Sequence, residues 1–220
     1  MTQETPEPQS NNKEKTLSML QAGEWTSTRS ATINPGDVGG ERVKFDARDL
    51  ALTAIFASLY VVINVLQTLM GGSITYGPVQ LRVADCLIAF AALLGLPVIG
   101  GVTLGCFITN AFYFLGVPDV VFGPIANLLA ATIIFVLRKH RFMGCLVGAL
   151  PVGFIVGGYL WIFFPPPEIL SALLAPVAMI ASITISSLIA IAGIGYLLLL
   201  ILSRPSILEP LKSHGLKVIK

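Results

Sequence analysis

Long apolar runs between Leu50 and Arg204 constrain this chain more than any other feature of its sequence. The charged residues inside that stretch are Arg82, Asp85, Asp119, Arg138, Lys139, Arg141 and Glu168. The runs between them approach the roughly 20 residues that a helix needs to cross a bilayer. Only 12% of the 220 residues are charged and 55% are hydrophobic, whereas a soluble domain carries roughly 25% charged residues. The sequence therefore predicts an integral membrane protein, an all-α bundle of helices.

Glycine, proline and charged residues divide the apolar region into six predicted transmembrane helices. They cover about 45–70, 79–94, 97–115, 119–137, 142–163 and 169–202, the last with a break at Pro176. Residues 1–44 are polar and lack the pattern of a cleaved signal peptide, which favours a disordered cytoplasmic tail. We expect the transmembrane domain to cover 45–203 and a basic cytoplasmic tail to cover 204–220.

The distribution of lysine and arginine predicts the orientation in the membrane. Basic residues lie before the first helix, between the fourth and fifth helices and after the sixth, and are scarce in the other connections. The positive-inside rule then places both termini of a multi-pass cell-membrane protein in the cytoplasm. Arg82 lies at the outer end of the second predicted helix, against this bias, which favours a site open to the outside.

Several functions are excluded by missing residue patterns. The cysteines Cys86, Cys106 and Cys145 have no C-x-x-C spacing, and the two histidines lie in basic segments. We therefore expect no metal and no cofactor. The transmembrane part has no Ser-His, Cys-His or paired-acid arrangement and no phosphate-binding loop, so we expect neither an enzyme nor an ATPase. A net charge of +2 gives no reason to expect a nucleic-acid partner.

Arg82 and Asp85 are the centre of the predicted site. Their three-residue spacing would place both side chains on one face of a helix, with Gln80 at its start. An ionisable group in lipid costs at least a few kcal/mol, so both should face the protein interior or a wet cavity. The alternative is a structural pair that closes a helix end.

Other polar residues are expected near the same outer helix ends. The predicted set comprises Asn64, Gln67, Gln80, Arg82, Asp85, Asn110, Tyr113 and Trp161. Such a set could bind a planar polar heterocycle, because a carboxylate accepts two N–H bonds and an arginine or aromatic ring stacks on its face. Asn127 is assigned to interhelical bonding or ligand contact. For Asp119, helix N-capping is favoured over ligand contact.

A strip of small side chains follows one face of the first predicted helix. Its members are Ala47, Ala51, Ala54 and Ser58. Small residues let a second helix approach closely, either within the bundle or from a partner protein.

Three segments of the chain resemble one known family. Gly77–Leu87, Gly105–Asn110 and Val121–Ala131 are similar to the QueT family of queuosine-precursor transporters, which are substrate-binding S components of energy-coupling-factor (ECF) transporters. The family pattern Gln-x-Arg-x-Ser-Glu-Ala-Leu corresponds to Gln80, Arg82, Ala84, Asp85, Cys86 and Leu87, with departures at 84, 85 and 86. The resemblance covers about residues 50–202.

The resemblance implies a six-helix S component that imports a queuosine or archaeosine precursor. Its ligand would be a 7-deazaguanine such as 7-aminomethyl-7-deazaguanine, and its partners a transmembrane coupling subunit and two ATPases. Asp85 would recognise the N–H edge of the ring or an aminomethyl cation, and Arg82 would orient Asp85 or stack. The small-residue strip would be the docking surface. The alternatives are an S component for a vitamin-like ligand and a structural membrane protein assembled through small-residue faces.

Overall fold

The computed structural model describes residues 46–75, 79–170, 172–213 and 218. The tail predicted for residues 1–44 lies outside these ranges. Every regular element within them is helical, and they contain no strand. The all-α prediction is therefore confirmed for the described part of the chain.

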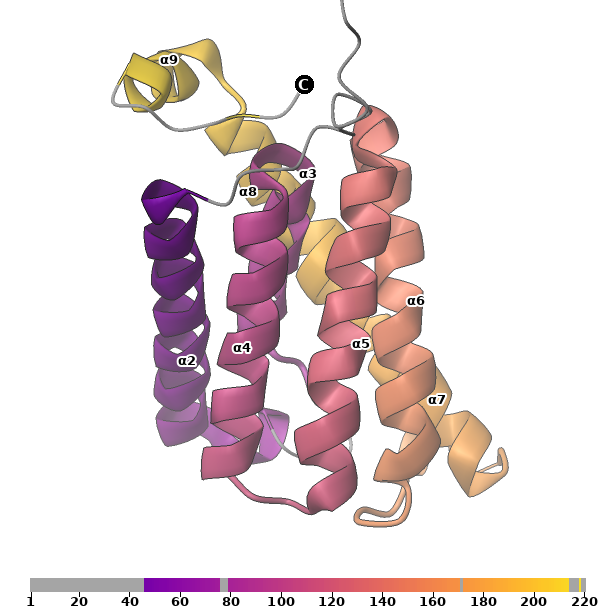
Figure 1. Ribbon diagram of the computed structural model, residues 1–220. Helices are drawn as coiled ribbons and strands as arrows, with labels where there is room; N and C mark the ends of the chain where they lie inside the picture. The colour runs from indigo at the N-terminus through magenta and orange to yellow at the C-terminus, as the bar shows by residue number, and fades with distance from the viewer. Residues whose placement is uncertain (1–45, 76–78, 171, 214–217, 219–220) are drawn as a thin grey trace, which may run out of the picture. The chain divides into compact units, whose positions relative to one another are not determined.

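Helices of three kinds make up the described chain (Figure 1). The α-helices are α2 (Ala47–Thr75), α3 (Ala91–Leu94), α4 (Leu96–Phe112), α5 (Val117–Val136), α6 (Arg141–Leu160), α7 (Ala175–Ser187), α8 (Tyr196–Leu202) and α9 (Pro205–Ser213). The 3₁₀ segments are η1 (Val83–Phe90), η2 (Arg138–His140) and η3 (Glu168–Leu170), and η4 (Leu188–Gly195) is a π-helix.

Four of the described helical stretches are long and apolar enough to cross a membrane. They are Ala47–Gly71, Val117–Val136, Arg138–Leu160 and Ala175–Leu202. Val83–Leu94 and Leu96–Phe112 are also apolar but shorter. Length and composition thus agree with a membrane protein, and six crossings remain a prediction that depends on the shorter pair.

The second predicted helix starts later than expected and is not a regular α-helix. It begins at Val83 rather than residue 79, and its first eight residues form the 3₁₀ segment η1. Arg82 before it is extended, with φ −86° and ψ 104°. Gln80 has a positive φ of 38°, which is uncommon for a residue with a side chain. The expected helical spacing of Arg82 and Asp85 is therefore wrong, because Arg82 precedes the helix.

Polar side chains from other helices hold the backbone that leads into η1. Gln67 on α2 donates its Nε2 hydrogen to the carbonyl of Leu81, and its Oε1 accepts the Val83 N–H at 2.8 Å. Ser186 on α7 donates its hydroxyl to the carbonyl of Val79. Non-helical backbone at membrane depth requires such partners, because lipid offers none.

Close helix contacts depend on glycine at two interfaces. Gly101 and Gly105 of α4 face α2 so closely that an added Cβ would lie 2.6 Å from the Phe56 Cβ and 2.7 Å from the Tyr60 Cβ. Gly157 of α6 faces α7, where a Cβ would lie 2.6 Å from the Ile180 Cα. Small residues at these points let the backbones approach, as is typical of membrane helices.

The last transmembrane stretch differs from a single kinked helix. Pro176 lies in the first turn of α7 rather than inside a continuous helix, a position that proline favours. The irregularity lies further along, where α7 passes into the π-helix η4 and then into α8. In Figure 1 these three elements follow one another through the bundle, and α9 extends from their end into the segment predicted as a tail.

Candidate binding site

Three charged side chains are buried in the described part of the chain. The exposed fractions are 6% for Arg82, 4% for Asp85 and 0% for Asp119. Arg82 and Asp85 lie at the start of η1, and Asp119 lies in the first turn of α5. A charged side chain is stable in a low-dielectric interior only when it is paired or hydrogen-bonded. The residues that contact these three side chains therefore define the site.

Asp85 belongs to a chain of hydrogen bonds that joins three helices. The Tyr60 hydroxyl of α2 donates to Asp85 Oδ1 at 2.6 Å. Asn127 of α5 donates its Nδ2 hydrogen to the same hydroxyl at 2.9 Å. Since Tyr60 accepts from Asn127, its own proton is available for Asp85, which acts as the acceptor at the end of the chain.

Asp119 forms an ion pair with Arg82. The distance from Arg82 Nη2 to Asp119 Oδ1 is 3.6 Å, and Tyr159 of α6 donates its hydroxyl to the same oxygen at 2.7 Å. The favoured N-capping role of Asp119 is wrong, because the cap of α5 is Gly116 and no side-chain cap bond forms. The asparagine Asn110 donates to the Asp119 carbonyl at 2.8 Å.

The cluster lies deeper than the outer helix ends where it was expected. Tyr60 is thirteen residues into α2, or about 20 Å along the helix at 1.5 Å per residue. Asn127 is near the middle of α5.

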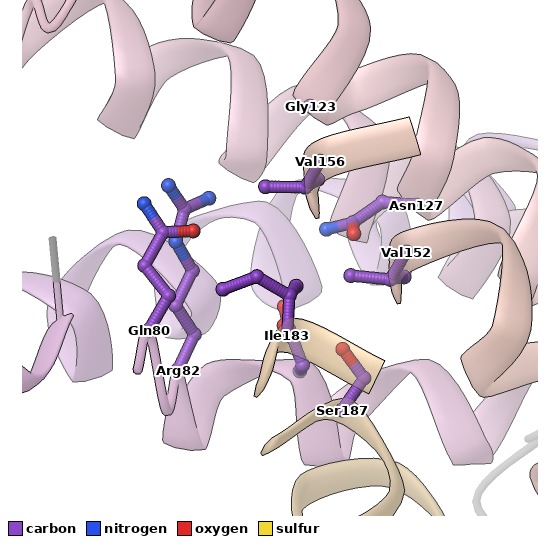
Figure 2. Close-up of a pocket in the computed structure, with 9 residues that line it drawn as sticks. Gln80, Arg82, Gly123, Asn127, Val152, Val156, Ile183 and Ser187 are labelled. Carbon is purple, nitrogen blue, oxygen red and sulfur yellow. The ribbon is translucent and has the colours of Figure 1, made fainter. Parts of the chain in front are cut away.

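A small cavity adjoins the cluster (Figure 2). Its lining residues are Gln80, Arg82, Asp85, Gly123, Asn127, Val152, Val156, Ile183 and Ser187. Figure 2 shows Gln80 and Arg82 together on one side, with Asn127, Val152 and Val156 opposite. Its volume of about 10 Å³ is room for about one water molecule. A bicyclic heterocycle would fit only if the apolar side chains of α6 and α7 moved apart.

Several buried polar atoms near the cluster have no hydrogen-bond partner among the described residues. They include Gln80 Nε2, Asn64 Oδ1, Asn110 Oδ1 and Asp119 Oδ2. Leaving a buried polar atom unpaired costs about 1–3 kcal/mol. A polar ligand that bonded these atoms would recover part of that cost.

The structure brings some of the predicted site residues together and leaves others apart. Asn64 is buried one turn from Tyr60 and donates to its backbone carbonyl at 3.1 Å. Tyr113 is half-buried at the end of α4, against the ring of Phe112. Trp161 is 42% exposed and donates to the Gly158 carbonyl. Neither aromatic residue lines the cavity.

Sequence reasoning missed two residues of the cluster and understated a third. Asp119 was assigned to capping, and neither Tyr159 nor Tyr60 was among the predicted site residues. A usable signal was present, because a tyrosine hydroxyl inside an apolar helix needs a buried partner.

The small-residue strip lies on the outer surface of the bundle. Ala47, Ala51, Ala54 and Ser58 are all exposed on α2. Tyr60 and Asn64 of the same helix are buried. Packing of the strip within this chain, one of the two expectations, is therefore wrong.

Apolar helices around a charged, amide-lined cavity define a helical membrane protein with an internal polar site. The model of the family described as QueT transporter matches residues 50–204. The chain belongs to the QueT transporter family.

One curated relative is the queuosine precursor transporter QueT of Lactococcus lactis subsp. cremoris (strain MG1363). It is 38% identical over 81 residues, which cover 37% of this chain and 46% of the relative. The match thus spans less than half of the relative's length. No solved structure matches the chain.

Proposed function

We propose that this protein is the membrane-embedded substrate-binding component of an ECF transporter and imports a 7-deazaguanine precursor of queuosine or archaeosine. The observation that carries the proposal is the buried polar cluster beside the cavity, with the unpartnered Nε2 of Gln80 among its groups. Membership of the QueT transporter family and the queuosine precursor named for the Lactococcus lactis relative support the ligand class.

The groups at the cavity match the edge of a guanine-like ring. The Asp85 carboxylate is an acceptor for ring N–H groups or for a cation on the ring substituent. The amides of Gln80 and Asn127 can donate or accept, and a guanidinium such as that of Arg82 can stack on a planar base. In this proposal the ligand enters from outside, both termini lie in the cytoplasm, and the lining side chains of α6 and α7 separate to admit it.

Replacing the cavity-lining polar groups should weaken ligand binding. For Asp85→Ala we expect the Kd of 7-aminomethyl-7-deazaguanine to rise by roughly 30-fold or more, because removing one side of a buried charged contact costs about 2–5 kcal/mol. For Gln80→Ala we expect roughly 5-fold, the value of a single hydrogen bond. Binding of the radiolabelled compound to purified protein in nanodiscs measures both.

Glu168→Ala is the matched control, because Glu168 is an exposed acid in η3. Its Kd should equal that of the wild type. Affinity unchanged in both cavity variants would remove Asp85 and Gln80 from the binding site. A labelled vitamin that competes with the deazaguanine would instead favour an S component for a different ligand.

The small cavity volume favours one other function. The chain would be a structural protein, and the polar cluster would hold its helices together. Thermal unfolding separates the two. The transporter proposal expects the deazaguanine to raise the melting temperature of the wild type. A structural protein would show no such shift, and Asp85→Asn would chiefly reduce its stability.

The exposed strip of α2 is the proposed docking surface for the coupling subunit. In the double variant Ala51→Leu/Ala54→Leu, less of the coupling subunit and its two ATPases should copurify with the protein. Overpacking a close contact costs about 1–3 kcal/mol, which is roughly 5- to 150-fold in Kd. The assay is affinity purification of the tagged protein from membranes that hold all four subunits, with the subunits quantified by mass spectrometry.

Ala111→Leu provides a matched control on the exposed surface of α4. It should leave copurification and ligand affinity unchanged. Full copurification by the Ala51→Leu/Ala54→Leu variant would show that the coupling subunit docks elsewhere.

A further inference from the structure

Gln80 has a strained backbone conformation. Its φ of 38° lies in the left-handed region, and among the described residues it is the one non-glycine residue with a positive φ. The conformation is unfavourable for a residue with a Cβ atom. Such strain persists only where the surrounding structure imposes it, and it is often found at functional sites. The contacts of this segment therefore indicate what the strained conformation is for.

Side-chain hydrogen bonds hold the backbone on both sides of Gln80. Ser186 of α7 donates its hydroxyl to the carbonyl of Val79, the preceding residue. Gln67 of α2 donates its Nε2 hydrogen to the carbonyl of Leu81, the following residue. Two different helices thus fix the backbone around the strained position.

The segment is not enclosed by packing on every side. Val79 and Leu81 line a second cavity of about 350 Å³, which is bounded also by residues of η3 and α7. Val79 is exposed. A backbone beside such a cavity has room to move, so loss of the hydrogen bond from Ser186 should let Gln80 relax toward ordinary backbone angles.

The side chain of Gln80 belongs to the buried cavity instead. Gln80 lines that cavity, and Figure 2 shows Arg82 beside it. It is 5% exposed, and its Nε2 atom has no hydrogen-bond partner among the described residues. An N–H group donates, so the ligand atom that fits it is an acceptor. A 7-deazaguanine has such an acceptor in its ring carbonyl oxygen, next to the N–H groups that suit Asp85.

We propose that Gln80 is a specificity-determining residue that donates to the ring carbonyl of the ligand, and that Ser186 is a positioning residue that holds Gln80 in its left-handed conformation. The inference rests on the proposed function and deepens it, because it assigns the carbonyl and the N–H groups of the ring to different residues. Ser186 is not among the residues that line the buried cavity. Its effect on the ligand must therefore pass through Gln80.

Two ligands of equal charge test the role of Gln80. One is 7-aminomethyl-7-deazaguanine, and the other is its 6-thio analogue, which keeps the ring N–H groups and replaces the carbonyl oxygen by a weaker acceptor. We expect wild-type protein in nanodiscs to bind the oxygen compound roughly 3-fold more tightly or better, most of the value of one hydrogen bond. In Gln80→Met, which keeps the side-chain length and removes the amide, the ratio of the two Kd values should fall to about 1. Isothermal titration calorimetry measures each Kd.

A double-mutant cycle tests the role of Ser186. Ser186→Ala should raise the Kd of the oxygen compound roughly 3-fold, because the amide loses its position. The same substitution in the Gln80→Met background should leave the Kd unchanged, since there is no amide left to position. Ser206→Ala removes the hydroxyl of an exposed residue of α9 and should change the Kd in neither background. Equal losses from Ser186→Ala in the two backgrounds would contradict the positioning role.

The wild-type ratio can overturn the inference even where a variant fails to fold. Equal Kd values for the oxygen and sulfur compounds would show that no donor reads the carbonyl, and the proposed deazaguanine site would stand without this assignment. Binding of neither compound would overturn the proposed function and the inference together. A ratio that persists in Gln80→Met would assign the carbonyl to another residue.

Discussion

Arg82→Met should reduce the unfolding free energy by about 3–5 kcal/mol, the usual cost of removing one partner of a buried ion pair. Arg82 is 6% exposed, and its guanidinium lies 3.6 Å from the Asp119 carboxylate. Methionine has a similar length but no charge, so the variant would bury two carboxylates beside no cation. Titration with SDS in mixed micelles measures the change in unfolding free energy.

A second substitution separates loss of charge balance from loss of packing. Arg82→Met/Asp119→Asn restores the formal charge of −1, and the asparagine oxygen still accepts the Tyr159 hydroxyl. We expect the double variant to be more stable than Arg82→Met. Arg82→Met/Glu168→Gln, which removes an exposed acid instead, should be no better than the single variant. Equal stability of the single variant and both double variants would show that arginine contributes packing rather than charge.

Gly157→Leu should destabilise the bundle by at least about 3 kcal/mol, at the upper end of ordinary overpacking. A Cβ at this position would lie 2.6 Å from the Ile180 Cα and 2.9 Å from the Ile180 nitrogen. These are backbone atoms, so no rotamer change in α7 relieves the clash. α6 and α7 would have to separate. The same SDS titration measures the loss of unfolding free energy.

The adjacent residue supplies a matched control. Gly158 is exposed, and a Cβ there would meet nothing within 4 Å. Gly158→Leu introduces the same side chain on the same turn and should change stability by less than about 0.5 kcal/mol, as surface substitutions usually do. Equal losses at the two positions would point to helix propensity rather than to the contact with α7.

Much of the fold followed from where the chain has apolar runs and where it has breaks. The predicted first, third, fourth and fifth helices lie within a few residues of α2, α4, α5 and α6. The reason is that lipid leaves the backbone few alternatives to a helix. Irregular segments were harder to predict, because their hydrogen bonds come from distant residues. Gln67 bonds the backbone at Leu81 and Val83, on either side of the extended residue Arg82, and no local pattern shows that pairing.

The sequence singled out residues that line one cavity, but it did not indicate where that cavity lies among the helices. Gln80, Arg82, Asp85 and Asn127 were all singled out, and they meet at one cavity. Their partners depend on tertiary contacts, since Tyr60 is 25 residues from Asp85 and Tyr159 is 40 from Asp119. Asp119 follows a proline at a helix start, where local chemistry favours capping. A contact with a distant arginine overrode that preference.

The two faces of α2 have different roles in the stretch that precedes Gly71, where the backbone departs from helical geometry. Tyr60 and Gln67 reach inward, to the Asp85 carboxylate and to the backbone that carries Arg82, while Ala51 and Ala54 are exposed. A helix transmits a tilt along its whole length, so a force applied to the outer face also moves the Tyr60 hydroxyl. Coupling between two sites is reciprocal. A group that holds the Tyr60 hydroxyl in place therefore opposes a tilt of α2 by the same coupling free energy.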